Sequence, residues 1–331
     1  MNQTELNQIA EIYGLGRIQS AVKNEKGLVN DTYYLKTDRG HFMAQKLNPI
    51  FTEAVVEDHD VVARHLLLND FLAPKIVEVR DNVLSARISG ALWKVCYYIP
   101  HDEDVKVSDK TVVEAAAALG RFHGIMGCCP LQPKFKIPNF HETRKIIEKL
   151  SRVFLSEEYA EKAMWVTEIY HDIVGSITKH YLPTDLSPTL IHGDPKFDNF
   201  LFRDGEVVGM FDLDTVMLGH ELLDLGDAFR SWCRESKTEF NLNRFNLALK
   251  AYRSKHNLWW RGGKLIGDDL VKDAVALITL ELAARYLIDY FEETYFDWKK
   301  YKYRSRAEQN LSRTKRYLAY YHNMQKAFGM E

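Results

Sequence analysis

The 331-residue chain is 46% hydrophobic and 27% charged, a composition that supports a large apolar core in one or two domains. Its net charge of −2 excludes a strongly basic or acidic protein, so we expect neither nucleic acid nor a membrane as a partner. Residues 1–5 lack the apolar core of a signal peptide, the four cysteines follow no disulfide or zinc spacing, and charges interrupt the apolar segment 274–290. We therefore expect a cytoplasmic protein.

The first part of the chain has the alternating pattern of β-strands. Residues 27–37 have an alternating pattern with Val29, Thr32, Tyr33 and Leu35, and 41–47 is a second strand after the turn Asp38-Arg39-Gly40, which together predict a hairpin. The loop before it contains a single glycine, and we interpret Asn30 in this loop as a candidate nucleotide contact. Lys46 ends the second strand on the face of Phe42 and Ala44. A lysine there often extends toward solvent, but in a nucleotide-binding protein it would contact the α- and β-phosphates.

Residues 52–68 predict an amphipathic helix after this hairpin. A carboxylate on such a helix could fix the ammonium group of Lys46. Glu57 is the preferred partner, and Glu53 and Asp58 remain open alternatives, because all three also fit a solvated helix face.

Two further strands are predicted at 83–88 and 92–99, and the second stops at Pro100. A strand that leaves a small sheet and enters a helical region is where a kinase hinge lies. We therefore interpret Tyr97 and Tyr98 as candidate adenine contacts through their backbone, with a plain edge strand as the alternative.

The chain after residue 100 is mostly helical in pattern. Helices are predicted at 111–126, with a Thr111-x-x-Glu114 capping box, from 138 past 150, at 157–181, from 221 onward, at 242–256 and at 273–291. We interpret His123 as a packing or capping residue, and the acids of 221–227 as groups that hold the backbone of a neighbouring loop. The predicted fold is α+β, with an N-terminal lobe at 1–99 and a helical C-terminal lobe at 100–331.

The most informative motif lies between these helices. His192-Gly193-Asp194 places an acid five positions before Asn199, and Asp212 follows thirteen positions after that asparagine. A phosphoryl-transfer site of the protein-kinase type needs one carboxylate to orient a hydroxyl, then an amide and a carboxylate to hold Mg²⁺.

Hairpin geometry supports this spacing. Residues 199–202 and 207–211 predict two strands around an Asp-Gly turn. In that register Asn199 lies opposite Met210, so Asp212 is its diagonal neighbour on the same face. Both side chains could then share an ion with ATP phosphates.

The motif resembles the signature of aminoglycoside phosphotransferases, choline kinases and their relatives. Further runs are similar to bacterial N-acetylhexosamine 1-kinases and cover most of the chain in that family's order. They are Asn30-Asp31-Thr32, Gln45-Lys46-Leu47-Asn48, Leu119-Gly120-Arg121-Phe122, Ile137-Pro138-Asn139-Phe140-His141, Phe211-Asp212-Leu213-Asp214-Thr215-Val216-Met217, Leu223-Asp224-Leu225-Gly226-Asp227 with Arg230, and Glu281-Leu282-Ala283-Ala284-Arg285-Tyr286-Leu287.

This resemblance implies a bilobal protein-kinase-like fold and ATP-dependent phosphorylation of a small-molecule hydroxyl, here the anomeric hydroxyl of an N-acetylhexosamine. It implies Asp194 as the catalytic base, and Asn199 and Asp212 as Mg²⁺ ligands. Lys196, two residues after Asp194, is a second catalytic candidate. Gly193-Asp194-Pro195 departs from the Asn-Asp-Thr usual in hexosamine kinases. Choline, an aminoglycoside, homoserine or a methylthio-sugar remain alternative acceptors, and a nucleotide-binding pseudokinase is the rival of another class.

Candidate residues for the acceptor, expected to be a sugar, are His141, Asp214 and Arg285. Asp214 shares a strand face with Asp212, so it could bond an acceptor hydroxyl or brace the loop. Arg285 could bind a sugar or phosphate, but Glu281, Arg285 and Asp289 also have the spacing of a surface ion-pair ladder.

Overall fold

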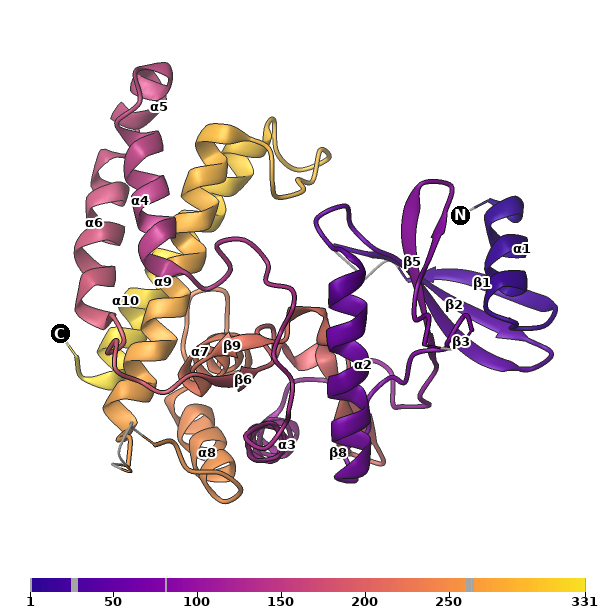
Figure 1. Cartoon of the computed structure of the whole chain (residues 1–331). Coiled ribbons are helices and arrows are strands. Elements are labelled where there is room, and N and C mark those ends of the chain that lie inside the picture. The colour runs from indigo at the N-terminus through magenta and orange to yellow at the C-terminus, as the bar shows by residue number, and fades with distance from the viewer. Residues whose placement is uncertain (1, 25–28, 81, 260–262, 264, 331) are drawn as a thin grey trace. The chain divides into compact units, whose positions relative to one another are not determined.

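The structure, a computed structural model, describes residues 2–24, 29–80, 82–259, 263 and 265–330 (Figure 1). The chain forms two compact units, and each is built from more than one segment. The first unit contains Met1–Lys106, Gly124–Ile137 and Asp198–Leu218, and the second contains Val107–His123, Pro138–Phe197 and Gly219–Glu331. The predicted boundary after residue 99 differs from this division, because two later segments belong to the first unit.

An antiparallel five-stranded sheet forms the N-terminal part of the first unit, as expected, with the strand order β1-β2-β3-β5-β4. The strands are β1 (Ile18–Asn24), β2 (Asp31–Thr37), β3 (Gly40–Lys46), β4 (Ala86–Ile88) and β5 (Ala91–Tyr97), with helices α1 (Gln3–Ile12) and α2 (Glu53–Leu68). The predicted strands 27–37 and 83–88 are shorter than expected, and residues 27 and 28 lie outside the described residues.

The two faces of this sheet carry different clusters of apolar side chains. Phe42, Ala44 and Trp93 lie on one face, in a cluster that includes Ile9 of α1. Leu92 and Cys96 lie on the other face and pack with Val55 and Val56 of α2. Because side chains alternate along a strand, this assignment also decides which face each polar residue of β3 and β5 occupies.

The hairpin of β7 (Phe200–Arg203) and β8 (Glu206–Met210) belongs to the first unit, and Leu72 attaches it there. The Leu72 amide donates to the Val208 carbonyl (2.9 Å), and the Met210 amide donates to the Leu72 carbonyl (3.0 Å). Gly209 permits this approach, because a Cβ at that position would lie 2.0 Å from the Leu72 oxygen.

The predicted register of this hairpin is correct at its turn and wrong at its far end. Arg203 pairs with Glu206 as expected, but the register shifts between Leu201 and Phe202. Phe200, and not Asn199, therefore lies opposite Met210. One extra residue on β8 causes the difference, as in a β-bulge, which sequence spacing alone does not reveal.

Helices dominate the second unit, and α9 (Asp268–Glu292) is at its centre. Figure 1 shows its neighbours, α4 (Thr143–Phe154), α6 (Thr167–Ile177), α7 (Glu221–Trp232) and α10 (Arg306–Phe328), which pack against it. The second unit also contains α5 (Ala160–Met164), α8 (Leu242–Arg253), β6 (Thr189–Ile191) and the short 3₁₀ helices η1 (Glu157–Tyr159) and η2 (Thr178–His180). The 3₁₀ helix η4 (Leu213–Thr215) belongs to the first unit, and the division between the units falls within α3 (Asp109–Met126), η3 (Phe197–Asn199) and β9 (Met217–Gly219).

Two helix predictions need correction. The predicted helix 157–181 is broken into four short pieces, with non-helical backbone at Val166 (φ −129°, ψ 14°). The capping box at Thr111 is wrong, because α3 begins at Asp109 and the Thr111 hydroxyl bonds to Ser108 instead. Over the part of the chain that the structure describes, none of the helices combines the length and apolar character of a membrane span.

Candidate active site

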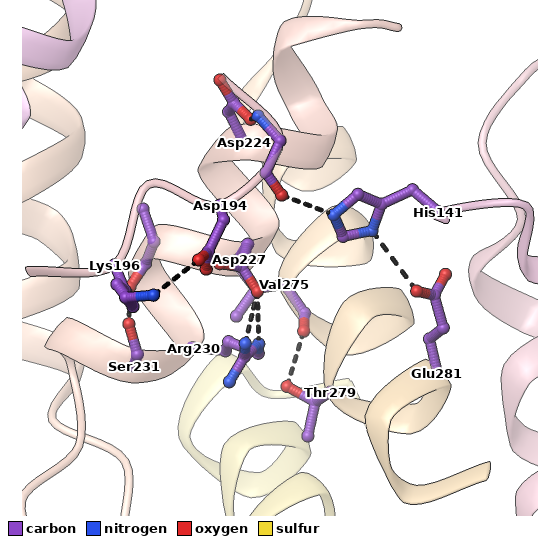
Figure 2. Close-up of polar contacts among 12 residues, drawn as sticks. His141, Asp194, Lys196, Asp224, Asp227, Arg230, Ser231, Val275, Thr279 and Glu281 are labelled. Carbon is purple, nitrogen blue, oxygen red and sulfur yellow. Dashed lines mark hydrogen bonds and ion pairs between the residues drawn. The ribbon is translucent and has the colours of Figure 1, made fainter. Parts of the chain in front are cut away.

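The loop after β6 presents the Asp194 carboxylate. Gly193 has a left-handed backbone (φ +83°), which turns the chain directly before Asp194. The Asp194 side chain is 29% exposed and accepts a hydrogen bond of 2.7 Å from the ammonium group of Lys196 (Figure 2). The loop therefore presents the partly exposed Asp194 carboxylate next to the ammonium group of Lys196.

Asp224 of α7 binds the backbone of this loop, as expected for the acids of 221–227. Its fully buried carboxylate accepts the backbone amides of His192 (2.7 Å) and Gly193 (2.8 Å). His123 Nε2 donates to the same carboxylate (2.9 Å), and His123 Nδ1 bonds to the Tyr252 hydroxyl (2.8 Å). Burial alone would raise the pKa of Asp224, but His123 and the backbone amides outweigh it and lower that pKa.

His141 holds the same loop from another side. Its Nε2 donates to the Gly193 carbonyl (2.9 Å), and its Nδ1 forms an ion pair with Glu281 Oε1 (3.3 Å; Figure 2). Both ring nitrogens face acceptors, which is the arrangement of an imidazolium. Burial alone would lower the pKa of His141, but Glu281 outweighs it and raises the pKa to about 9. The predicted acceptor residue His141 is thus a bracing group of the Asp194 loop.

A second ion pair lies on α7 next to Asp194. Arg230 Nε donates to Asp227 Oδ1 (3.0 Å), and Figure 2 shows the pair beside Asp194. Burial alone would lower the pKa of Arg230, but the Asp227 carboxylate outweighs it, with a further contribution from Asp194, and raises that pKa. Arg230 therefore remains a cation near the candidate base.

The surface ion-pair ladder, which was the alternative interpretation of Glu281, Arg285 and Asp289, does not form. Glu281 is buried against His141, and buried Asp289 accepts the backbone amide of Tyr295 (2.7 Å). The Arg285 guanidinium instead lies over the rings of Tyr295 (5.6 Å) and Phe296 (5.7 Å).

Asn199 and Asp212 belong to the first unit and have the donor chemistry of a magnesium site. The Phe211 amide donates to the Asn199 carbonyl (3.0 Å), and Asp212 has a left-handed backbone (φ 61°, ψ 51°) before η4. Mg²⁺ prefers oxygen ligands and commonly combines one or two carboxylates with phosphates and water. Within the described ranges, no three or more His, Cys, Asp or Glu side chains gather as a metal site. The two residues therefore fit a metal shared with a phosphate ligand.

The predicted pairing of Lys46 with Glu57 is absent. Glu57 bonds instead to Lys134 (2.5 Å). Lys46 lies opposite Trp93 in the sheet, so it occupies the face that carries Phe42. This placement argues against the predicted contact between Lys46 and the phosphates of ATP, because a different lysine lies on the sheet face that packs against α2.

That lysine is Lys94 on β5, which we did not predict as a site residue. Its buried ammonium group forms an ion pair with Asp214, and His59 Nδ1 of α2 lies 3.2 Å from Lys94 Nζ. Asn30 Nδ2 donates to Asp214 Oδ2 (3.0 Å). Asp214 and Asn30 therefore bind each other, whereas we expected an acceptor contact and a nucleotide contact. The sequence pattern that singled out Lys46 was a lysine within an apolar strand, and Lys94 has the same pattern.

The hinge candidates use their backbone amides within the protein. The Tyr97 amide donates to the Lys75 carbonyl (2.9 Å), and the Tyr98 amide donates to the His41 carbonyl (3.1 Å). These two N–H groups are thus engaged, and an adenine contact at this strand end needs other backbone groups.

Comparison with known proteins identifies the family of this chain. Residues 20–259, well over half of the chain, match the family described as "Phosphotransferase enzyme family". The chain belongs to the phosphotransferase enzyme family. It is an enzyme that transfers a phosphoryl group to a hydroxyl acceptor.

This phosphotransferase is similar to curated homoserine kinases over most of its length. It is 22% identical over 301 residues to the homoserine kinase of Methylocella silvestris, which covers 88% of this chain and 87% of the relative. It is also 22% identical over 302 residues to that of Rhodospirillum rubrum, covering 90% and 87%.

Solved structures share the phosphotransferase's fold. Amicoumacin kinase hAmiN, in complex with AMP-PNP, Ca²⁺ and Ami, has a TM-score of 0.69 at 16% identity and covers 97% of this chain and 93% of its own. A choline/ethanolamine kinase family protein from Mesorhizobium loti has a TM-score of 0.58 at 18% identity, covering 95% and 97%. The predicted kinase-like fold is thereby confirmed.

Proposed function

We propose that the phosphotransferase uses ATP and Mg²⁺ to phosphorylate the hydroxyl of a small molecule, with Asp194 as the base that orients this hydroxyl. The observation that carries the proposal is the braced Asp194 loop. Asp224 binds two of its backbone amides and His141 binds its Gly193 carbonyl, while the Asp194 carboxylate itself stays partly exposed. Such rigid support around one exposed acid suits a residue that must be positioned for chemistry.

In the proposed reaction the acceptor oxygen forms a bond to the γ-phosphorus, and the bond from that phosphorus to the bridging β–γ oxygen breaks. The hydroxyl proton passes to Asp194. Asn199 and Asp212 would hold Mg²⁺, which supplies charge neutralisation at the phosphates when it is bound. Lys196, bonded to Asp194 at 2.7 Å, and Arg230 provide positive charge near the transferring group.

The proposed acceptor is the anomeric hydroxyl of an N-acetylhexosamine, which would give a sugar 1-phosphate. Its support is the resemblance of the runs 211–217, 223–227 and 281–287 to N-acetylhexosamine 1-kinases. Homoserine is the second candidate, because the homoserine kinase relatives align over nearly nine-tenths of the chain. The proposed setting is the cytoplasm, where ATP is available.

Mg²⁺-dependent ADP release with a panel of acceptors tests both candidates. The panel holds N-acetylglucosamine, N-acetylgalactosamine, glucose, galactose, homoserine, choline and kanamycin. We expect turnover with an N-acetylhexosamine and none with its 1-O-methyl glycoside. Turnover with homoserine alone would replace the acceptor and keep the site.

The Asp194→Asn variant tests the assigned base in the same assay. We expect kcat to fall by about 10²–10⁴-fold with little change in the KM for ATP, because a positioned base contributes on that scale. Asp198→Asn is the matched control, since Asp198 is an exposed acid in η3, directly after the Asp194 loop. Unchanged turnover in Asp194→Asn would contradict the assignment, and no turnover with any acceptor would favour the pseudokinase.

A further inference from the structure

Lys94 is an unusual residue in the sheet of the first unit. Its side chain is 1% exposed, although an ammonium group is costly to remove from water. It lies opposite Gln45 of β3 and two residues from Cys96, so it occupies the sheet face that packs against α2. A buried lysine is retained only with a close partner, and here that partner is Asp214.

Three separate elements converge on the Asp214 carboxylate. Lys94 reaches it from β5, His59 reaches it from α2 with Nδ1 at 3.6 Å, and Asn30 donates to it from the loop before β2 at 3.0 Å. Asn30 Oδ1 in turn accepts the backbone amide of Asn48 after β3 (2.9 Å). The position of Asp214 is therefore fixed by the sheet, the helix and the loop together.

Asp214 lies two residues after Asp212, in the single turn of η4 that Asp212 precedes. A left-handed backbone at a residue other than glycine is strained and persists only where its surroundings hold it. Asp214, anchored two residues further along the chain, restricts the backbone that follows Asp212. Burial alone would lower the pKa of Lys94, but the Asp214 carboxylate outweighs it and raises that pKa, with a smaller contribution from Asp212.

We propose that Lys94 is a positioning residue for the metal ligand Asp212 and acts through Asp214, with His59 as the contributor from α2. The proposal rests on the proposed function, because it takes Asp212 as a magnesium ligand. Lys94 then links sheet, helix and metal loop, whereas the expected pair of Lys46 with Glu57 would have fixed a lysine at the phosphates of ATP. The arrangement differs in that the helix supplies an imidazole and the metal loop supplies the carboxylate.

A paired replacement separates positioning from stability. Lys94→Met with Asp214→Leu removes both charges of the buried pair and leaves neither uncompensated, so the chain should fold, since such apolar replacements are often tolerated. Thermal unfolding of the full chain checks this. Lys23→Met is the matched control, because Lys23 forms an exposed ion pair with Asp31 on the same sheet (2.8 Å).

The decisive readout is the affinity for Mn²⁺ in the presence of AMP-PNP and in the absence of any acceptor. Electron paramagnetic resonance measures this affinity. We expect the double variant to bind Mn²⁺ at least tenfold more weakly than the unaltered chain, and the Mg²⁺ concentration for half-maximal activity to rise in parallel. The Lys23→Met control should bind as the unaltered chain does. A folded double variant with unaltered Mn²⁺ affinity would overturn the proposal and leave the proposed function standing.

His59→Gln keeps the test valid if the double variant fails to fold. A glutamine amide can replace Nε2, which bonds to the Pro74 carbonyl (2.8 Å), but it places no group where Nδ1 faces Asp214. We expect a several-fold loss of Mn²⁺ affinity in this variant, and unaltered affinity would again overturn the proposal. If the unaltered chain binds no Mn²⁺ with AMP-PNP, the proposed function and this inference both fail.

Discussion

Asp224→Asn is the sharpest test of how the candidate base is held. The substitution preserves the size of the side chain and removes its charge. In the structure Asp224 Oδ2 accepts from the His192 amide and from His123 Nε2, while Oδ1 accepts from the Gly193 amide. If the asparagine oxygen takes the place of Oδ2, its NH₂ group faces the Gly193 N–H, and two donors then oppose each other.

The expected cost follows from these contacts. Losing one hydrogen bond to a charged group costs about 1.5–3 kcal/mol, and the two remaining bonds weaken when the carboxylate becomes an amide. We expect the free energy of unfolding to fall by about 3–5 kcal/mol at pH 7. Because the loop carries Asp194, kcat should fall as well, although Asp224 itself does not touch the reacting atoms.

Urea unfolding at several pH values measures this effect. The lowered pKa of Asp224 means that its stabilisation is present above the ordinary aspartate pKa of 3.8 and is lost as the pH falls through the folded-state value. The difference between variant and unaltered chain should therefore shrink below about pH 4. Asp185→Asn, at an exposed position, is the control and should change stability by less than about 0.5 kcal/mol. An Asp224→Asn variant within 1 kcal/mol of the unaltered chain at pH 7 would refute the reasoning.

Two further substitutions have expected outcomes. In His141→Gln, the stabilisation lost is about 3 kcal/mol, because the pKa of His141 is raised from 6.5 to about 9. This contribution is complete below pH 6.5 and disappears as the pH rises through 9. The unfolding free energies of the variant and the unaltered chain should therefore converge between pH 6.5 and 9. A difference that stays constant over this range would contradict the ion pair of His141 with Glu281. Gly209→Ala should lower the free energy of unfolding by several kcal/mol, because its Cβ would lie 2.0 Å from a backbone oxygen, whereas Gly175→Ala, with no atom within 4 Å, should raise it by about 0.5–1 kcal/mol in the same urea titration.

Much of the local structure could be read from the chain. The alternating segments became β2, β3 and β5, the amphipathic segment became α2, and the Asp-Gly pair closed the β7–β8 hairpin with Arg203 opposite Glu206. The prediction for Asp224 is also confirmed, since it binds the backbone of the Asp194 loop, whereas Asp227 pairs with Arg230 instead. These features depend on residues close together in the sequence, where periodicity, turn residues and capping act directly.

The partners of the charged residues could not be read in the same way. Glu57 pairs with Lys134, and Asp214 pairs with Lys94, across 77 and 120 positions of sequence. Lys46 and Lys94 both lie within apolar strand segments, so the sequence pattern alone does not distinguish them. Only the pairing of β3 with β5 shows that Lys94 shares a face with α2, while Lys46 shares a face with Trp93.

The sequence by itself therefore predicted the chemistry that we propose for this phosphotransferase: an acid, an amide and a second acid at kinase spacing, on either side of a hairpin that follows a short strand. The tertiary structure decided which cation pairs with Asp214. A buried charge must find partners on other elements, because its own neighbours along the chain cannot enclose it, and the sheet order brings those partners together.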